Sequence, residues 1–185
     1  MNIGLVGEAP SDTSSIQNLL ERKYSDVKYF AMLNGINGSM LDNQKTKRLL
    51  RIEYEQTQPQ VVVFIRDLDG LITEQDKIDA RKKYFTEFNS VVDKKGILLL
   101  NIYEIEALIF ADVDSFNVRY SSNIQSVEDP SHITDPKGKL KLECKKYKES
   151  ENPEIFKILI FDKLLNCSYF KEFCNKFEKS IHRPA

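Results

Sequence analysis

Apolar residues along this 185-residue chain fall into short continuous runs and longer stretches with helical spacing. Continuous runs occur at 2–6, 61–65 and 96–102, and a weaker run occurs at 27–31. An apolar run of this length without alternation is typical of a strand that is buried on both faces of a parallel sheet. The pattern therefore predicts a central sheet of about four strands.

Stretches with helical spacing separate these runs. The first begins at Ser11 or Asp12, which are good N-terminal caps, and others begin at Asn43 and Thr73. Another helical stretch follows the fourth run and ends near Asp112. Strands that alternate with helices in this way predict a three-layer α/β fold with a mostly parallel sheet.

The pattern changes after residue 112. Residues 113–136 are rich in turn formers, which predicts loops, and residues 137–185 show helical spacing with no strand-like run. We therefore divide the chain into an α/β core at 1–112 and a helical C-terminal extension at 113–185 that packs on the core.

Composition narrows the class of protein. With 41% hydrophobic and 30% charged residues, the chain has the profile of a soluble globular domain. The formal net charge of −1 excludes a strongly basic, tail-driven DNA binder, but it leaves open an enzyme whose acidic site offsets a basic groove. The apolar runs are far shorter than the ~20 residues needed to span a bilayer. Three cysteines at irregular spacing make a poor disulfide framework, so we expect a cytoplasmic protein without a membrane partner.

Three of the predicted strands are followed by acidic residues. Glu8 follows the first strand, Asp67 and Asp69 follow the third, and Glu104 and Glu106 follow the fourth. Because ligands of parallel sheets bind outside the carboxyl ends of the strands, we expect these side chains to line one site. Carboxylates that converge repel one another unless a cation or a proton compensates them. Oxygen ligands of this kind suit Mg²⁺ or Mn²⁺.

The spacing of these acids sets further expectations. Asp67 and Asp69 lie two residues apart on an expected extended backbone, so both side chains should point to the same side. Glu104 and Glu106 share a side only while the backbone stays extended, because in a helix they diverge by about 200°. We favour Glu104, which is nearer the strand end, with Glu106 close behind. The alternative role for each single acid is to cap a turn or a helix.

Two segments resemble the Toprim domain, which topoisomerases, bacterial primases and the overcoming-lysogenization-defect nucleases share. They are GLVGEAPSDTSSIQNLL at 4–20 and VVVFIRDLDG at 61–70. In this chain, as in that domain, a predicted strand ends in a glutamate, which a small turn, Ser-Asp and a helix follow. A later apolar strand ends in Asp-x-Asp. The stretch at 102–112, with Asp-Pro-Lys at 135–137, looks like a small stand-alone Toprim-like family related to these nucleases. The resemblance covers residues 1 to about 112, and it departs from the usual glutamate-glycine step at Glu8-Ala9.

The resemblance implies a Toprim-like, Rossmann-like fold and a divalent-metal-dependent nuclease that cleaves DNA or RNA. It assigns Glu8 as general acid or base, and Asp67 and Asp69 as Mg²⁺ or Mn²⁺ ligands. In the nuclease branch, acids at the places of Asp12 and Glu104 often complete a two-metal site. Glu106 is the alternative to Glu104. Asp12 equally fits a plain helix cap. The resemblance also implies phage defence beside an ATPase partner.

Basic residues supply candidate contacts to nucleic acid. The segment 137–148 contains six lysines and one glutamate, and Lys137, Lys139 and Lys141 could line a phosphate groove. The alternative for this segment is a solvated helix face. Arg66 either pairs with a neighbouring carboxylate or contacts a scissile phosphate.

Three classes of function remain open at this point. The first is the metal-dependent nuclease, and the second is a Toprim-like binding module that engages a partner protein and has little or no activity. The third is a receiver-like or phosphatase-like α/β enzyme, which is disfavoured because its key aspartate usually follows the first strand, where this chain has Glu8. Aromatic residues at helical spacing in 156–177 belong to the core or to a homodimer contact.

Overall fold

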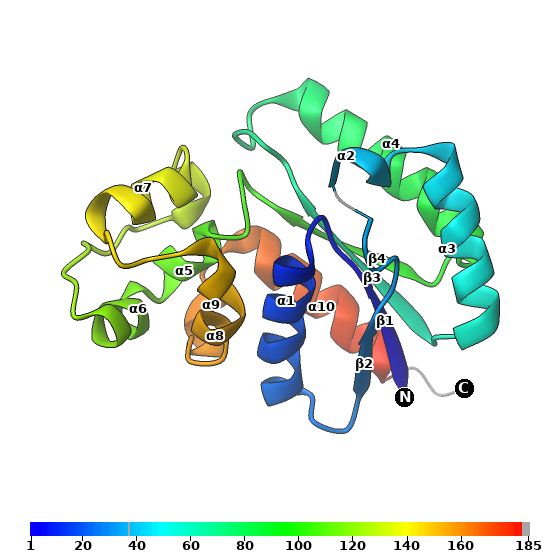
Figure 1. Ribbon diagram of the computed structural model, residues 1–185, viewed down its shortest axis with the longest axis horizontal. Coiled ribbons are helices and arrows are strands. Elements are labelled where there is room, and N and C mark those ends of the chain that lie inside the picture. The colour runs from blue at the N-terminus through cyan, green and yellow to red at the C-terminus, as the bar shows by residue number, and fades with distance from the viewer. Residues whose placement is uncertain (37, 183–185) are drawn as a thin grey trace.

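A four-stranded parallel sheet with helices on both faces forms the centre of the protein, as a computed structural model of residues 1–36 and 38–182 shows (Figure 1). The strands are β1 (Asn2–Val6), β2 (Lys28–Ala31), β3 (Val61–Asp67) and β4 (Gly96–Asn101), in the order β2-β1-β3-β4. All neighbouring strands are parallel. The predicted α/β class with about four strands is therefore confirmed.

The order of the strands creates a switch point beside β1. The chain passes from β1 to β2 on one side and then to β3 on the other, with Leu5 opposite Ala31 in β2 and Val63 in β3. In open parallel sheets, ligands bind outside the carboxyl ends of the strands where the order reverses. The residues that follow β1 and β3 therefore occupy the position expected for a ligand site.

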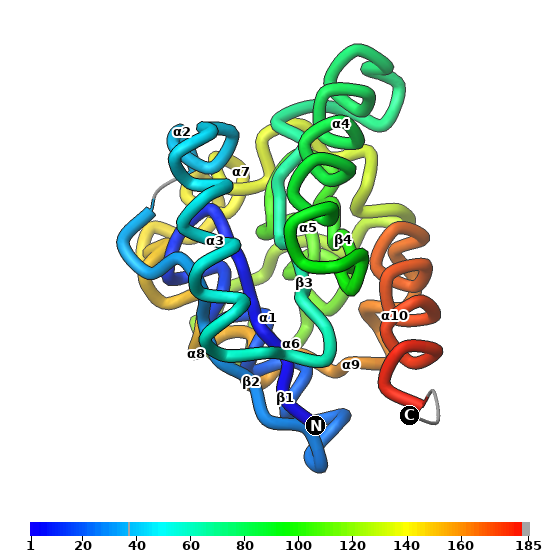
Figure 2. The backbone as a smooth tube through the Cα atoms, turned by 90° about the vertical axis from the view of Figure 1, so that its right-hand side faces the viewer, coloured from blue at the N-terminus to red at the C-terminus, as the bar shows by residue number. Residues whose placement is uncertain are grey.

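Helices cover the two faces of the sheet in two layers (Figure 2). On one face lie α1 (Pro10–Lys23) and α10 (Ser168–Ile181), and on the other lie α3 (Gln44–Thr57) and α4 (Gln75–Val91). A short helix, α2 (Gly38–Leu41), precedes α3. Alternate residues of β3 enter the two cores, because Val63 packs on the α1 side and Phe64 on the α4 side.

The start of α1 differs from the prediction. The N-cap is Ala9, and Pro10 is the first helical residue, where its missing N–H costs nothing. Ser11 and Asp12 therefore do not cap the helix as predicted. Asp12 instead accepts a hydrogen bond from the Ala9 N–H at 3.1 Å. This bond satisfies a backbone donor that has no partner within the helix.

The sequence predicts that two further helices begin at Asn43 and Thr73. Asn43 is the N-cap of α3, and its side chain accepts a hydrogen bond from the Lys45 N–H at 2.8 Å. Thr73 does not cap α4, because the N-cap position is taken by Glu74. The Glu74 carboxylate accepts from the Leu71 N–H at 2.7 Å and so stabilises the turn that leads into the helix.

The chain after β4 is mostly helical. Its elements are α5 (Ala107–Ala111), α6 (Val113–Tyr120), a 3₁₀ turn at Pro130–His132, α7 (Pro136–Glu143), a 3₁₀ turn at Glu149–Glu151, α8 (Asn152–Phe156), α9 (Phe161–Leu164) and α10. The prediction of loops at 113–136 is therefore wrong for α6. Val113, Phe116 and Tyr120 form one buried face of this helix at helical spacing. Residues 183–185 of the predicted extension lie outside the described part of the chain.

The C-terminal helices share a core with the sheet. Phe156 and Phe177 belong to the same buried cluster as Ile3 and Ile16. Two long-range hydrogen bonds tie α1 to the segment around α8, from the Asn18 side chain to the Pro153 carbonyl at 2.9 Å and from Arg22 to the Leu159 carbonyl at 2.7 Å.

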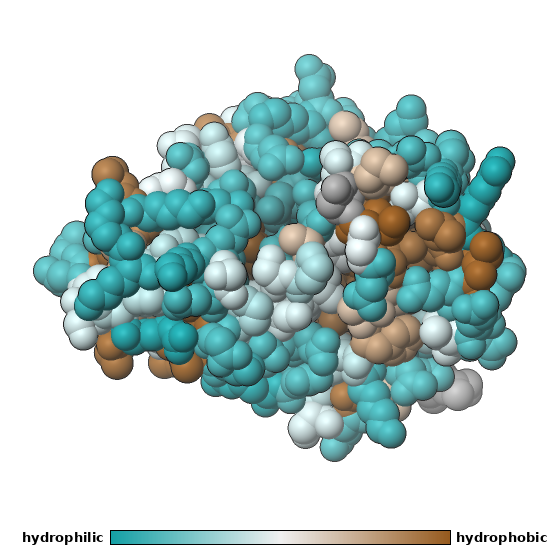
Figure 3. Space-filling model, in the orientation of Figure 1, coloured by the Kyte–Doolittle hydropathy of each residue, from teal (hydrophilic) through white to brown (hydrophobic). Residues whose placement is uncertain are grey.

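Two features of the surface follow from this arrangement. Most of the face in Figure 3 is hydrophilic, and apolar side chains gather over α3 and the neighbouring β2, where α3 exposes Leu49 and Ile52. Among the residues that the structure describes, no helix is both long enough and apolar enough to cross a membrane.

Replacing Phe156 with alanine tests this shared core. Because the Phe156 side chain is fully buried, we expect Phe156→Ala to lower the free energy of unfolding by about 3–4 kcal/mol in urea denaturation. Ile158→Ala, two residues away and 37% exposed, should cost less than about 1 kcal/mol. Equal effects of the two variants would contradict the shared core.

Candidate functional site

Four carboxylates gather at the switch point of the sheet. Glu8 follows β1, Asp67 is the last residue of β3, Asp12 lies in the first turn of α1, and Glu106 precedes α5. They are close enough for Asp12, Glu8 and Glu106 each to raise the pKa of Asp67 by repulsion. We call these four residues the acidic cluster.

Asp67 has the most protected position in the acidic cluster. Burial, followed by the repulsion from Asp12, raises its pKa well above the usual range. The side-chain amide of Asn101 donates to Asp67 Oδ1 at 3.0 Å and partly offsets this effect. The backbone N–H of Asp67 donates to Glu8 Oε1 at 3.1 Å, which ties the ends of β1 and β3 together.

Asp12 serves both the helix and the acidic cluster. Its residue surface is only 8% exposed. Burial, and then the repulsion of Glu106 and Glu8, raises the pKa of Asp12 to about 7, while its bonds to Ala9 and Ser11 act in the opposite direction. Asp12 therefore stabilises the first turn of α1 from the third helical position, and its role as a metal ligand remains a prediction.

Glu106 has a buried carboxylate with one oxygen unpaired within the described part of the chain. Its residue surface is 1% exposed, and its Oε1 accepts from Asn152 at 3.0 Å and lies 3.2 Å from the Tyr147 hydroxyl. Its Oε2 is buried without a hydrogen-bond partner among the described residues. Burial raises the pKa of Glu106, although Lys137 opposes the shift. A buried carboxylate oxygen without a donor is costly, which favours a ligand or a proton at this position.

Glu104 and Glu106 lie in different surroundings, and which of them binds a metal remains a prediction. The backbone turns at Tyr103, whose φ is +62°, and it is already helical at Glu106. Glu104 accepts from the Lys137 N–H at 3.3 Å and its Oε1 lies 3.5 Å from Lys137 Nζ. Glu106, which is buried beside Asp12, is therefore the better candidate ligand of the two.

Asp69 does not share the surroundings of Asp67. Its φ is +55°, so the extended backbone expected from the sequence, and with it the common side of the two aspartates, is wrong here. The Asp69 side chain is 60% exposed, and its Oδ2 lies 2.7 Å from Nη2 of Arg81 in α4. A metal-binding role for Asp69 remains a prediction that requires this ion pair to open.

Arg66 is buried within the sheet and pairs with carboxylates, which is the first of its two predicted roles. Its Nε lies 2.7 Å from Glu8 Oε1, and its Nη1 donates to Asp42 at 3.1 Å. The Tyr84 ring lies 4.3 Å from the guanidinium carbon. Burial acts to lower the pKa of Arg66, but Glu8, Tyr84 and Asp42 outweigh it and keep the pKa raised. The contact of Arg66 with a phosphate remains a prediction.

The three candidate lysines of α7 already have partners within the chain. Lys137 Nζ lies 3.1 Å from Glu149 and 3.5 Å from Glu104, and Lys141 Nζ lies 3.8 Å from Glu149. Lys139 Nζ lies 5.3 Å from the centre of the Phe110 ring. Their contacts with nucleic acid remain predictions, and only Lys137 is also near the acidic cluster, 3.9 Å from Glu106.

The acidic cluster fits a hard divalent cation in its chemistry. All its donors are carboxylate oxygens, and two buried oxygens, Glu106 Oε2 and Asn101 Oδ1, have no hydrogen-bond partner among the described residues. Within residues 1–36 and 38–182, however, no three His, Cys, Asp or Glu side chains are grouped so as to hold one ion. An ion bound by three of these carboxylates therefore requires side chains to rotate.

Several residues that contact the acidic cluster or Arg66 are not predicted from the sequence. Asn101 is a polar residue at the end of an apolar run, and this feature could have identified it. Asp42, Tyr147 and Asn152 lie in segments without a motif, and only the fold brings them to Arg66 and Glu106.

The fold and the site define a parallel α/β protein with buried carboxylates at the switch point of its sheet. The chain belongs to the protein family described as Domain of unknown function (DUF4276), whose model matches residues 7–178. Comparisons with curated proteins and with solved structures gave no significant match.

The raised pKa of Asp12 predicts a pH-dependent stability. Because the folded state holds this proton more tightly than the unfolded state, the metal-free protein should lose stability as the pH rises from about 4 to above 7. Asp12→Asn keeps the hydrogen-bond acceptor and removes the charge. In urea denaturation with a chelator, it should be more stable than the parent at pH 8 by about 2–4 kcal/mol, with the difference vanishing near pH 4.

Asp26→Asn is the matched control, because Asp26 is an exposed aspartate in the turn between α1 and β2. It should change stability by less than about 0.5 kcal/mol at either pH. A difference between the parent and Asp12→Asn that does not depend on pH would contradict the electrostatic explanation.

Proposed function

We propose that this chain is a divalent-metal-dependent phosphodiesterase, related to the Toprim nucleases, that hydrolyses DNA or RNA. The observation that carries the proposal is the acidic cluster, in which buried carboxylates raise one another's pKa at the switch point of the sheet. Such an arrangement is unfavourable for folding, and perturbed groups of this kind are concentrated at functional sites.

The residues of the cluster divide the work between them. Asp67 and Glu106, with Asp12 beside them, would hold Mg²⁺ or Mn²⁺, and Asn101 keeps the Asp67 carboxylate oriented. The bound ion would polarise the phosphodiester and stabilise negative charge on the departing oxygen. Glu8, which Arg66 holds beside Asp67, would receive or deliver the proton at its carboxylate.

The proposal also includes a partner and a substrate. The resemblance to small Toprim-like proteins supports a defence effector that a partner ATPase controls, and nucleic acid is the substrate that the phosphodiester chemistry requires. Lys137 is the lysine of α7 best placed to contact a phosphate near the acidic cluster, because it lies 3.9 Å from Glu106.

One observation favours a second candidate function. Arg66 already compensates Glu8, and Lys137 compensates Glu104, so the chain supplies part of the positive charge that a metal would bring. A Toprim-like binding module that engages a partner protein without cleaving nucleic acid would need no more than this. Calorimetric titration with Mg²⁺ and Mn²⁺ separates the two functions, since the phosphodiesterase must bind an ion and the module need not.

Cleavage assays test the proposed activity directly. Purified protein with Mn²⁺ or Mg²⁺ should cleave DNA or RNA, and a chelator should abolish the cleavage. Asp67→Asn and Glu106→Gln should each lower the cleavage rate by about 100-fold or more, because each removes a charge that acts in the transition state. Asp69→Asn should have a smaller effect, since this side chain is exposed and paired with Arg81.

The exposed variant Asp26→Asn serves again as the control and should stay within about twofold of the parent rate. Thermal unfolding must show that each variant is folded. If Asp67→Asn and Glu106→Gln cleave as well as the parent, the proposed site is wrong.

Binding of nucleic acid should depend on the metal. Without an ion, the acidic cluster repels phosphate, so a cleavage-deficient Glu8→Gln protein, which keeps the proposed metal ligands Asp67 and Glu106, should bind oligonucleotides at least about fivefold more tightly with Mg²⁺ than with a chelator. Filter binding at constant ionic strength measures this difference. Equal affinity under the two conditions would argue against a metal at the nucleic-acid site.

A further inference from the structure

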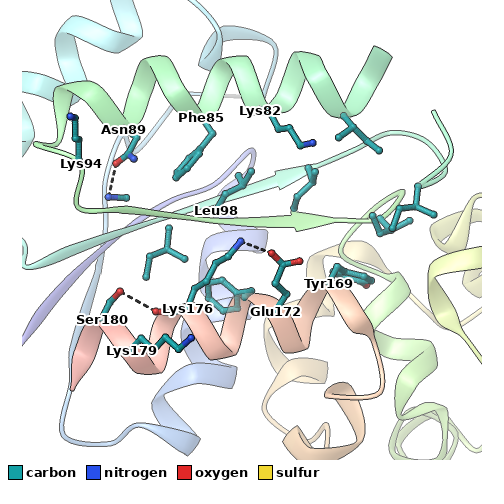
Figure 4. A pocket seen from close by; sticks show the side chains of 17 residues that line it. Lys82, Phe85, Asn89, Lys94, Leu98, Tyr169, Glu172, Lys176, Lys179 and Ser180 are labelled. Atoms are coloured by element: carbon teal, nitrogen blue, oxygen red, sulfur yellow. Dashed lines mark hydrogen bonds and ion pairs between the residues drawn. The ribbon is translucent and has the colours of Figure 1, made fainter. Parts of the chain in front are cut away.

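A groove of about 730 Å³ runs along the edge of the sheet that lies opposite β2. Its base is β4, which is an edge strand because, within the described part of the chain, β3 alone pairs with it. Helix α4 forms one wall of the groove and α10 forms the other (Figure 4).

The backbone of β4 leaves hydrogen-bonding groups directed into this groove. The carbonyls of Lys95 and Asn101 accept bonds from the β3 side, from Val62 at 3.0 Å and from Leu68 at 2.9 Å. Because peptide groups alternate in direction along a strand, residues 96, 98 and 100 direct theirs to the free edge.

The surroundings of this edge agree with that assignment. The N–H of Gly96 is capped by the Asn89 side chain at 2.7 Å, whereas the N–H groups of Leu98 and Leu100 have no partner among the described residues. The edge therefore presents a short row of donors and acceptors to any chain that lies beside it.

The walls of the groove are apolar where they approach β4. Phe85 projects from α4, Phe173 lies on α10, and Leu98 and Leu100 expose part of their side chains from the strand. An added strand would direct alternate side chains toward α4 and toward α10. Apolar residues of such a strand would be covered on both sides of the sheet.

The rim of the groove carries an excess of positive charge. Lys82 and Lys94 lie on the α4 side, and Lys176 and Lys179 lie on α10 (Figure 4). Glu172 neutralises Lys176 at 2.6 Å. The other three lysines have no ion pair within the part of the chain that the structure describes.

We propose that the free edge of β4 is a docking site for an acidic, extended segment of a partner protein, which adds to the sheet as a fifth strand. The unpaired backbone groups would supply hydrogen bonds, and the two walls of the groove would select apolar side chains on both faces of the docked strand. The lysines favour Asp or Glu on the docked segment.

The lysine rim also argues against a second copy of the chain as the occupant. Pairing β4 with β4 of another molecule would bring two rims of lysines together, and such like charges are a common device against the pairing of edge strands. No residue of the acidic cluster lines the groove, so this proposal does not depend on the proposed phosphodiesterase activity.

A fluorescent peptide with a central run of valines flanked by glutamates tests the proposal. Fluorescence anisotropy with the full chain should show saturable binding that weakens as salt rises, and a peptide with lysine in place of glutamate should bind at least tenfold more weakly. The double variant Lys82→Glu/Lys179→Glu should bind the acidic peptide at least tenfold more weakly than the parent.

The matched control is Lys83→Glu/Lys171→Glu. It makes the same change in charge on the same two helices, at exposed lysines that do not line the groove. This control should stay within about threefold of the parent. Equal losses in the two double variants would overturn the proposal, because they would show attraction by net charge alone.

A backbone variant tests the strand addition itself. Leu98→Pro removes an N–H that faces the groove and leaves the pairing with β3 intact, so it should fold and weaken peptide binding at least fivefold. Hydrogen exchange offers the same test without a variant, since the peptide should slow exchange at Leu98 and Leu100. Absence of saturable binding, or protection elsewhere only, overturns the proposal. So does a concentration-dependent dimer that Lys82→Glu/Lys179→Glu alters, because a second copy would then occupy the groove.

Discussion

The buried ion pair between Arg66 and Glu8 connects the parts of the molecule that form the site. Arg66 comes from β3, Glu8 follows β1, and the same guanidinium reaches Asp42 after α2 and the Tyr84 ring of α4. Such a pair adds little net stability, but losing one partner leaves a buried charge without compensation and costs several kcal/mol. The pair therefore fixes where the ends of β1 and β3 lie relative to the helices.

The charges that remain after this pairing are unequal. Glu8 has Arg66 and Glu104 has Lys137, whereas Asp12 and Asp67 have no cation that the structure pairs with them. Their raised pKa values show that ionising these buried carboxylates costs free energy, which no cation in the described part of the chain offsets. A protein that tolerates such a cost at the carboxyl ends of its strands is suited to a ligand that supplies the missing charge, and this is the reason for proposing a metal site there.

The sequence predicts the sheet well because β1, β3 and β4 are continuous apolar runs, and burial on both faces leaves little room for another interpretation. It fails where two loops meet. The Asp69 N–H donates to the Tyr103 carbonyl, and the Tyr103 N–H donates to the Gly70 carbonyl, so each loop sets the other's backbone. Both Asp69 and Tyr103 have positive φ as a result, which turns Asp69 outward and brings Glu106 in place of Glu104. No local pattern contains this information.

The near-zero net charge hides a separation of charge within the fold. Carboxylates lie at the switch point between β1 and β3, and unpaired lysines lie along the free edge of β4. An acidic segment of a partner would be repelled by the first region and attracted by the second. The proposed divalent ion at the acidic cluster would lower the negative charge of the first region without changing the second. Partner docking and phosphate binding therefore need not compete, since each depends on a different surface of the same sheet.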